Sequence, residues 1–311
     1  MIVTVTFNPS YDKTLEVHDF AAGRTVRART LRRQPAGKGV NVSRCAADLG
    51  EASVVTGFVG RGEAEVFADS FTGTQATPQF VVVAGATRQN TTLIDSQGGA
   101  ETHIREEGFA VTPYDVEALR GRLAELLKEG DLVVFAGSMP PGMLPEHLAE
   151  FVQLCRGLGC TVAVDTSGPA LRAAVDAECS IIKPNLEELC ELSGERIEDD
   201  EGMAAAAQVL LGRVKILLVT LGADGAACFT RDGAWRASAA GVEARNAVGA
   251  GDAFLAGFAV GYVRGLSLEA SLRQAVACGA ASVMVDWAGE VDAGRVRTLA
   301  KKVKSAAVPG F

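Results

Sequence analysis

The chain has 311 residues, 48% of them hydrophobic and 22% charged, and its formal net charge at pH 7 is −8. This composition is typical of a folded protein with a large core and excludes an intrinsically disordered chain. The negative charge argues against a nucleic acid or a membrane surface as a partner, although a local basic pocket could still bind an anionic substrate. The longest apolar run, residues 253–263, is too short to cross a bilayer.

Cysteine and histidine usage points to a protein without disulfides. The seven cysteines are odd in number, include no Cys-x-x-Cys pair and follow no signal peptide, which favours reduced thiols in a cytoplasmic protein. The three histidines are dispersed, so surface or turn positions are favoured over a transition-metal site. Because no internal repeat or low-complexity segment is present, we expect one main domain over residues 1–311, with a small appendage.

The N-terminal segment predicts a buried strand at residues 2–7 that ends in a turn at residues 8–10. Asp12 is therefore expected just beyond the end of a strand, where open α/β sheets bind their ligands. A solvated carboxylate in a turn is the alternative interpretation.

Two charged, alternating segments predict a small β lid. Residues 14–34 interleave arginines with apolar residues, so they cannot form a central strand of a parallel sheet. Residues 91–95 and 101–104 flank a Gly-containing turn and predict a hairpin. We expect the lid to comprise about residues 12–34 and 88–106 and to shield reacting groups from water.

The segment Gly37-Lys38-Gly39 precedes an amphipathic helix predicted at residues 40–49. At the N-terminus of this helix, the Lys38 ammonium and the Asn41 amide suit a sugar phosphate or a sugar hydroxyl. A helix-capping turn with an exposed lysine is the alternative.

Arg88 is the next cationic candidate, between a strand predicted at residues 80–83 and the lid hairpin. Its guanidinium group could hold a phosphate with two parallel hydrogen bonds. Since exposed arginines are common, a solvated side chain is the alternative.

Beyond residue 112, alternating helices and strands predict βαβ winding, and hence a parallel sheet with helices on both faces. Ligands of such a sheet bind at the carboxyl ends of its strands. The predicted helices span residues 114–128, 145–158, 268–284 and 291–304, and the predicted strands 132–136, 161–164, 181–182, 215–221 and 226–229. The strand exits where chemistry is expected are residues 137–142, 165–168 and 183–185.

Asn185 and Glu188 open a further predicted helix and share one face near its N-terminus. Mg²⁺ keeps most of its waters and takes only one or two protein oxygens, so this pair could hold the ion. The alternative is an ordinary acidic residue at a helix end.

The stretch at residues 246–257 combines an anion site with a base. Gly249 and Gly251 allow a tight turn whose N–H groups point outward at the start of a helix. Asp252 follows in the first turn, where the helix dipole is expected to keep its carboxylate ionised beside a bound phosphate. This combination suits phosphoryl transfer, because amides stabilise the transferring group while the base accepts the hydroxyl proton.

Three other interpretations of this stretch either require no function or match the residues less well. A tight turn followed by a helix-start Asp needs no catalytic role. A dinucleotide-binding fingerprint would require a small residue at Phe254, and it would follow a first strand. A Walker loop would require Ser or Thr after its Gly-Lys pair, where the only such pair here is followed by Gly39.

The same residues carry a family resemblance. The segment Val248-Gly249-Ala250-Gly251-Asp252-Ala253-Phe254, with Gly257, resembles the C-terminal signature of the ribokinase-like (PfkB) sugar kinases. Residues 35–42 resemble their N-terminal signature, with Ala36 at a position where the family usually has glycine. The segment Asn8-Pro9-x-x-Asp12-Lys13 resembles the subgroup of phosphofructokinases and tagatose-6-phosphate kinases.

The resemblance implies a three-layer α/β fold, in which helices flank a mostly parallel sheet and a small β-sheet forms a lid. It also implies a role for each matching residue. Catalysis falls to Asp252 with Gly249, Ala250 and Gly251; sugar-phosphate binding to Asp12, Gly37, Lys38, Gly39, Asn41, Arg88 and Ser138; nucleotide binding to Lys183, Asn185, Thr220, Gly222 and Gly225; and Mg²⁺, held through water, to Glu188 and Asn185.

The implied activity is the ATP- and Mg²⁺-dependent phosphorylation of a phosphorylated ketohexose, first of all fructose 1-phosphate to fructose 1,6-bisphosphate. Tagatose 6-phosphate and fructose 6-phosphate are alternative substrates. A non-catalytic sugar-phosphate sensor and a hydride-transferring oxidoreductase are the rivals from other classes. A homodimer formed through the lid is the candidate assembly.

Overall fold

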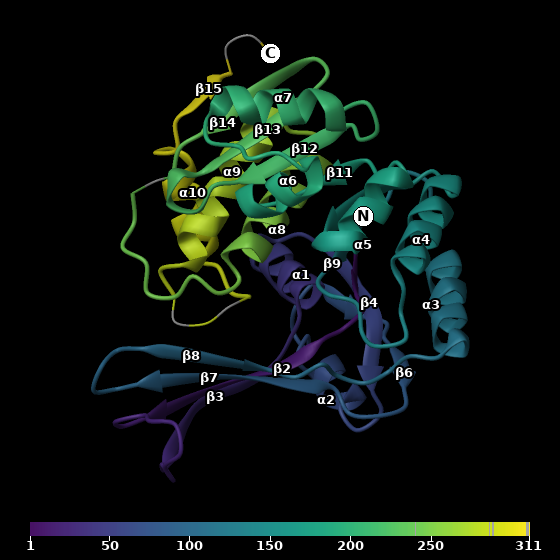
Figure 1. The fold of residues 1–311 in the computed structure, drawn as a ribbon. Coiled ribbons are helices and arrows are strands. Elements are labelled where there is room, and N and C mark those ends of the chain that lie inside the picture. The colour runs from purple at the N-terminus through teal and green to yellow at the C-terminus, as the bar shows by residue number, and fades with distance from the viewer. Residues whose placement is uncertain (240, 286, 288, 309–310) are drawn as a thin grey trace.

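The computed structural model describes residues 1–239, 241–285, 287, 289–308 and 311. Figure 1 shows a large sheet between two layers of helices, with a smaller sheet extending away from it. The expected three-layer α/β fold with a small second sheet is therefore confirmed.

The centre of the large sheet is parallel, and its strand order is β15-β14-β13-β12-β11-β10-β9-β1-β4-β5, with β6 also paired to β4. Its central strands are near-continuous apolar runs, as required when helices cover both faces. The parallel strands are β1 (Ile2–Thr6), β4 (Ser53–Gly60), β5 (Ala76–Pro78), β6 (Val81–Val83), β9 (Leu132–Ala136), β10 (Thr161–Asp165), β11 (Ile181–Ile182) and β12 (Ile216–Thr220). An antiparallel extension adds β13 (Ala226–Thr230), β14 (Gly233–Ala237) and β15 (Ser305–Ala307).

The helices form two separate hydrophobic layers, one on each face of the large sheet. One layer contains α3 (Pro113–Leu126), α4 (Pro145–Gly157), α5 (Gly168–Asp176), α6 (Leu186–Ser193) and α7 (Asp200–Leu210). The other contains α1 (Lys38–Asp48), α8 (Ala250–Val263), α9 (Leu268–Ser282) and α10 (Ala293–Ala300). A short helix, α2 (Ala64–Asp69), packs Phe67 into a third, smaller core. No helix within the described ranges is long and apolar enough to cross a membrane.

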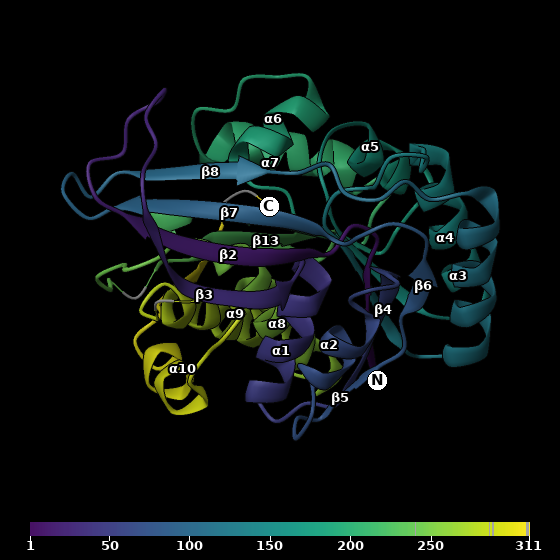
Figure 2. The same ribbon diagram turned by 90° about the horizontal axis from the view of Figure 1, so that it is seen from below.

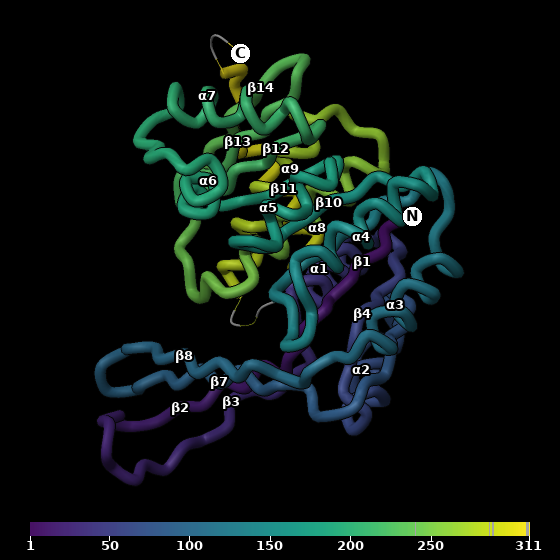
Figure 3. Tube along the Cα trace, turned by 45° about the vertical axis from the view of Figure 1, so that its right-hand side comes forward, coloured from purple at the N-terminus to yellow at the C-terminus, as the bar shows by residue number. Residues whose placement is uncertain are grey.

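The small sheet has the strand order β3-β2-β7-β8 and lies beside α1 and α8 in Figure 2. It comprises β2 (Ser10–Val17), β3 (Ala28–Ala36), β7 (Arg88–Asp95) and β8 (Glu101–Arg105). The hairpin expected at residues 91–104 is confirmed as the antiparallel pair of β7 and β8. In Figure 3 the small sheet projects to one side of the body.

One alternative and one prediction made from local pattern differ from the structure. Asp12 lies beyond the end of β1, as expected, but it is not a turn carboxylate, because the chain enters β2 at Ser10 and Asp12 pairs with Gln34 of β3. The helix expected at residues 291–304 is confined to α10, capped by the Asp292 side chain. Beyond it the chain forms β15, which pairs with β14, so a tertiary contact overrides the local helical pattern.

Candidate active site

The first turn of α8 carries the predicted base. Gly249 caps the helix with a φ of 81°, in the left-handed region that favours glycine. Asp252 is only 6% exposed, and its Oδ2 accepts a hydrogen bond of 2.8 Å from Asn41 Nδ2 of α1. The N-terminal turns of α1 and α8, which are far apart in the sequence, thus meet at the buried carboxylate of Asp252.

Burial overturns the expectation that Asp252 is fully ionised at neutral pH. Removal from water, and after it the negative charge of Asp165, raise the pKa of Asp252 to about 7. Lys38, the hydrogen bond from Asn41, and Lys183 act in the opposite direction but do not offset the burial. The dipole of α8 favours the carboxylate, yet it is the weaker influence here.

Lys38 and Lys183 share a single carboxylate. Lys38 Nζ lies 2.9 Å from Asp165 Oδ1, and Lys183 Nζ lies 3.3 Å from Asp165 Oδ2. Burial would raise the pKa of Asp165, but the two ammonium groups outweigh it and hold that pKa below its usual value. The Lys38 ammonium is therefore anchored by the buried carboxylate of Asp165. Burial is the largest single influence on the pKa of Lys38 and lowers it, but the attraction of Asp165, Asp252 and Glu188 and the hydrogen bond to Asp165 together outweigh burial, so the pKa is raised.

The turn before α1 accommodates Ala36 without strain. Ala36 is fully buried as the last residue of β3, paired with Ser10, and it does not have a positive φ. The close approaches come at Gly37, where a Cβ would lie 2.8 Å from Thr6 Cγ2, and at Gly39, where it would lie 2.5 Å from Thr6 Oγ1 of β1. These two glycines let α1 begin directly against the strand, and Ala36 leaves this geometry unchanged.

Arg88 and Ser138 lie together at the other side of Lys38. Arg88 Nη2 donates to the backbone oxygen of Asn8 at 2.9 Å and to Ser138 Oγ at 3.3 Å. Burial lowers the pKa of Arg88, and Asp12 partly opposes this change. A Cβ on Gly137 would lie 3.7 Å from Lys38 Cβ, so the Gly137-Ser138 exit of β9 borders the Lys38 stem. The guanidinium group of Arg88, the hydroxyl of Ser138 and the side-chain stem of Lys38 therefore border one region.

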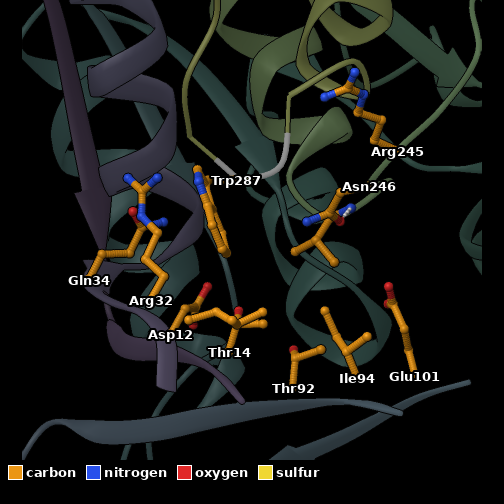
Figure 4. Close-up of a pocket in the computed structure, with 12 residues that line it drawn as sticks. Asp12, Thr14, Arg32, Gln34, Thr92, Ile94, Glu101, Arg245, Asn246 and Trp287 are labelled. Carbon is orange, nitrogen blue, oxygen red and sulfur yellow. Dashed lines mark hydrogen bonds between the residues drawn. The ribbon is translucent and has the colours of Figure 1, made fainter. Parts of the chain in front are cut away.

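A cavity of about 310 Å³ lies between the small sheet and the body. In Figure 4, Asp12, Thr14 and Thr92 rise from the small sheet toward Trp287 and Asn246 of the body. Ser10 Oγ donates to Asp12 Oδ1 at 2.9 Å, and Asn90 Nδ2 donates to the same atom at 3.2 Å. Both hydrogen bonds therefore fall on one oxygen of Asp12, a residue that lines the cavity.

Trp287 is a residue that the sequence did not single out. The guanidinium carbon of Arg32, on β3, lies 5.1 Å from the centre of the Trp287 ring, and Arg32 also forms an ion pair with Glu290. These contacts join the small sheet to the segment after α9. No motif or periodicity marks Trp287, because its role depends on a tertiary contact.

A second cavity, of about 400 Å³, borders the strand exits of β11 and β12. Of the residues predicted to bind a nucleotide, Asn185, Thr220 and Gly222 line this cavity, whereas Lys183 and Gly225 do not. Asn185 and Glu188 form a reciprocal cap of α6, in which Asn185 N donates to Glu188 Oε2 at 2.9 Å and Glu188 N donates to Asn185 Oδ1 at 2.8 Å. Gly225 adopts a φ of 92° at the β12–β13 turn, where a Cβ would meet Ala237 O at 2.0 Å.

Comparison with known proteins identifies the class. The profile of the pfkB family carbohydrate kinases matches residues 5–289. A protein of Vibrio cholerae named 1-phosphofructokinase is 32% identical over 308 residues, covering 99% of this chain and 97% of its own. A Staphylococcus epidermidis protein named tagatose-6-phosphate kinase is 27% identical and covers 98% of this chain and 99% of its own. A solved structure of phosphofructokinase-2 from Escherichia coli, in complex with fructose-6-phosphate, has a TM-score of 0.89 at 25% identity, covering 96% of this chain and 98% of its own.

The chain therefore belongs to the PfkB family of carbohydrate kinases. It is a phosphotransferase with an alcohol group as acceptor.

Proposed function

We propose that the protein phosphorylates fructose 1-phosphate with ATP, giving fructose 1,6-bisphosphate and ADP. The observation that carries the proposal is the group of Arg88, Ser138 and Lys38 beside the buried Asp252. Two cations and a hydroxyl exceed what neutral sugar hydroxyls need and suit a phosphate that the sugar already carries. The relative named 1-phosphofructokinase, similar over nearly its full length, supports this substrate.

In the proposed mechanism the sugar phosphate is held at both ends. Arg88 and Ser138 bind its existing phosphate, and Asp12 accepts hydrogen bonds from ring hydroxyls. The attacking hydroxyl then faces Asp252, which takes its proton as the oxygen attacks the γ-phosphate of ATP. The N–H groups in the first turn of α8 stabilise the charge that develops on the transferring group.

ATP is proposed to occupy the second cavity, with Lys183 directed to its phosphates. Lys183 is 5% exposed and lies close to the start of α8, since a Cβ on Gly251 would be 3.6 Å from its Nζ. The Lys183 ammonium would then lie between the bound ATP and the N-terminus of α8. Thr220 and Gly222 border the same cavity.

Mg²⁺ fits this site through Glu188 and Asn185. The α6 cap engages Glu188 Oε2, which leaves Oε1 of a partly exposed carboxylate to face solvent and a hydrated ion. When bound, Mg²⁺ would neutralise charge on the ATP phosphates during transfer.

Replacing Glu188 with Gln tests the metal assignment. The amide keeps the hydrogen bond to Asn185 N and removes only the negative charge. We expect the Mg²⁺ concentration for half-maximal activity to rise by about tenfold, with little change in the KM for the sugar phosphate. A Mg²⁺ titration that coincides with that of the wild type would assign Glu188 to capping alone.

The pH profile tests the protonation of the base. Because the pKa of Asp252 is raised to about 7, kcat/KM should rise with pH, reach half its plateau near pH 7, and level off above pH 8. A catalytic carboxylate with an ordinary pKa would instead give a flat profile from pH 5.5 upward. Rates measured at constant ionic strength, with Mg²⁺ and ATP saturating, separate these results.

Tagatose 6-phosphate and fructose 6-phosphate remain the alternative substrates, supported by the names of the Staphylococcus relative and of the solved complex. The deciding experiment is turnover of fructose 1-phosphate, fructose 6-phosphate, tagatose 6-phosphate, fructose and ribose at equal concentrations. The proposal predicts the highest kcat/KM for fructose 1-phosphate. A preference for an unphosphorylated sugar would contradict the phosphate pocket, and an absence of ATP turnover would favour the sensor.

The proposal includes a cytoplasmic homodimer formed through the small sheet. In its support, the edge strand β8 is exposed along its whole length, and Ile104 is 52% exposed. The seven cysteines are free, which suits a reducing compartment. Light scattering of the wild type and of Ile104→Glu would test the dimer, because a buried charge on β8 should shift the mass to that of one chain.

A further inference from the structure

Asp165 is a buried charge to which the proposed mechanism gives no role. It is the last residue of β10 and only 1% exposed. A lone ionised carboxylate at such a position would cost several kcal/mol, so it must be paired to remain charged. Its partners are the ammonium groups of Lys38 and Lys183, one on each oxygen.

The two lysines serve different sides of the site. Lys38 begins α1 and borders the Gly137-Ser138 exit of β9, on the sugar side. Lys183 follows β11 and approaches Gly251 at the start of α8, on the nucleotide side. The attacking and leaving groups of a phosphoryl transfer must lie in line between these two sides.

We propose that Asp165 is a positioning residue, which fixes Lys38 and Lys183 at a set separation so that each holds the phosphate on its own side of the transfer. It touches neither substrate and acts through the two lysines. This inference rests on the proposed kinase activity and adds to it a residue that couples sugar binding to nucleotide binding.

A purely structural ion pair is the competing interpretation. That pair would stabilise the sheet edge without affecting the reacting groups. The two interpretations differ in what happens at the reacting groups, where the pKa of Asp252 depends on Asp165, Lys38, Lys183 and the hydrogen bond from the neutral Asn41. The buried thiol of Cys45 also faces Asp252, whose charge raises the pKa of that thiol. Asp165 raises the pKa of Asp252, and both lysines lower it.

Asp165→Asn is the primary variant, because it keeps the side-chain shape and removes the charge. If Asp165 positions both lysines, the KM for the sugar phosphate and the KM for ATP should each rise by about tenfold. The acid limb of the kcat/KM profile is the part at low pH, where the rate rises as Asp252 loses its proton. It should move to lower pH by about one unit, because the negative charge of Asp165 no longer raises the pKa of Asp252 and the positive charges of both lysines remain.

Asp131→Asn is the matched control. Asp131 is also buried and ion-paired, 3.1 Å from the N-terminal amino group, but it lies at the start of β9, away from the site. We expect it to lower the unfolding temperature and to leave the acid limb and both KM values unchanged. An Asp165→Asn profile that matches this control would overturn the inference.

Lys38→Met tests the link from the opposite side and covers the case in which Asp165→Asn does not fold. Removing this ammonium should move the acid limb to higher pH, because Lys38 lowers the pKa of Asp252. An acid limb that stays in place in this variant would overturn the inference as well.

A readout without turnover separates this inference from the proposed function. The unfolding midpoints of chains with Asp252 and with Asp252→Asn, compared from pH 4 to pH 9, report the pKa of Asp252 directly. The same comparison in the Asp165→Asn background should give a pKa about one unit lower. If the wild type turns over no sugar phosphate but this shift is found, the proposed function fails and the influence of Asp165 on the site stands; an unshifted value overturns the inference.

Discussion

The Asp252→Asn enzyme is expected to lose kcat by about 100-fold or more, while the KM values for sugar phosphate and ATP stay within about twofold. Asparagine keeps the shape of the side chain and can still accept the hydrogen bond from Asn41 Nδ2. It cannot accept the proton of the attacking hydroxyl. Steady-state kinetics on purified enzyme with saturating Mg²⁺ measure the loss.

The same variant should be more stable than the wild type at high pH. The pKa of Asp252 is higher in the folded chain than in the unfolded one, so its contribution to stability is full below about pH 4 and is lost as the pH rises through about 7. The neutral amide avoids this loss. Thermal unfolding should therefore show a higher midpoint for Asp252→Asn at pH 8.5 and equal midpoints near pH 4.

Asp232→Asn, in an exposed turn, is the control for both measurements and should change neither. Near-normal turnover by Asp252→Asn would falsify the assignment of the general base. A lower unfolding midpoint at pH 8.5 would contradict the burial argument separately, because that argument does not depend on the reaction.

Arg88→Ala is expected to raise the KM for the sugar phosphate by about 10- to 100-fold, a loss of roughly 1.4 to 2.8 kcal/mol. The guanidinium group is held in place by backbone oxygens of Asn8 and Glu106, so it is oriented before substrate arrives. Its removal takes a cation from the phosphate end and leaves the nucleotide side intact. The KM for ATP should change little.

Arg213→Ala is the matched control, since Arg213 is 58% exposed and pairs with Asp176 away from both cavities. It should leave both KM values unchanged. If fructose is turned over at all, Arg88→Ala should not affect its KM. An equal change for fructose and fructose 1-phosphate would show that Arg88 acts through the fold and not through the phosphate.

The layers of the fold could be predicted because its strands and helices are long and periodic. The strand β9 has the predicted bounds, and α4 begins at the predicted residue. The local conformation of Asp12 could not be predicted, because strand β2 belongs to a second sheet, whose pairing with β3 and β7 depends on distant residues. The predicted length of α10 was wrong for the same reason, because the chain beyond the helix forms β15 by pairing with the distant strand β14.

The residues of the site could be named from motifs, but their energetics could not. The capping signature of Asn185 and Glu188 was readable as either a cap or a metal site, and the structure shows the cap. The ionisation of Asp252 was mispredicted because a helix dipole is visible in sequence and burial is not. The sequence indicated Asp165 only as a carboxylate at a strand exit. Its pairing with Lys38 and Lys183 could not be predicted, because the two lysines come from other elements.

The most direct test of the account is transfer of the γ-phosphate in a single turnover. Excess enzyme is mixed with ATP labelled in its γ-phosphate, Mg²⁺ and fructose 1-phosphate at pH 8, and the products are separated. The account predicts label in fructose 1,6-bisphosphate for the wild type and transfer about 100-fold slower or more for Asp252→Asn. Label that appears only in inorganic phosphate, or equal transfer by the two enzymes, would contradict it.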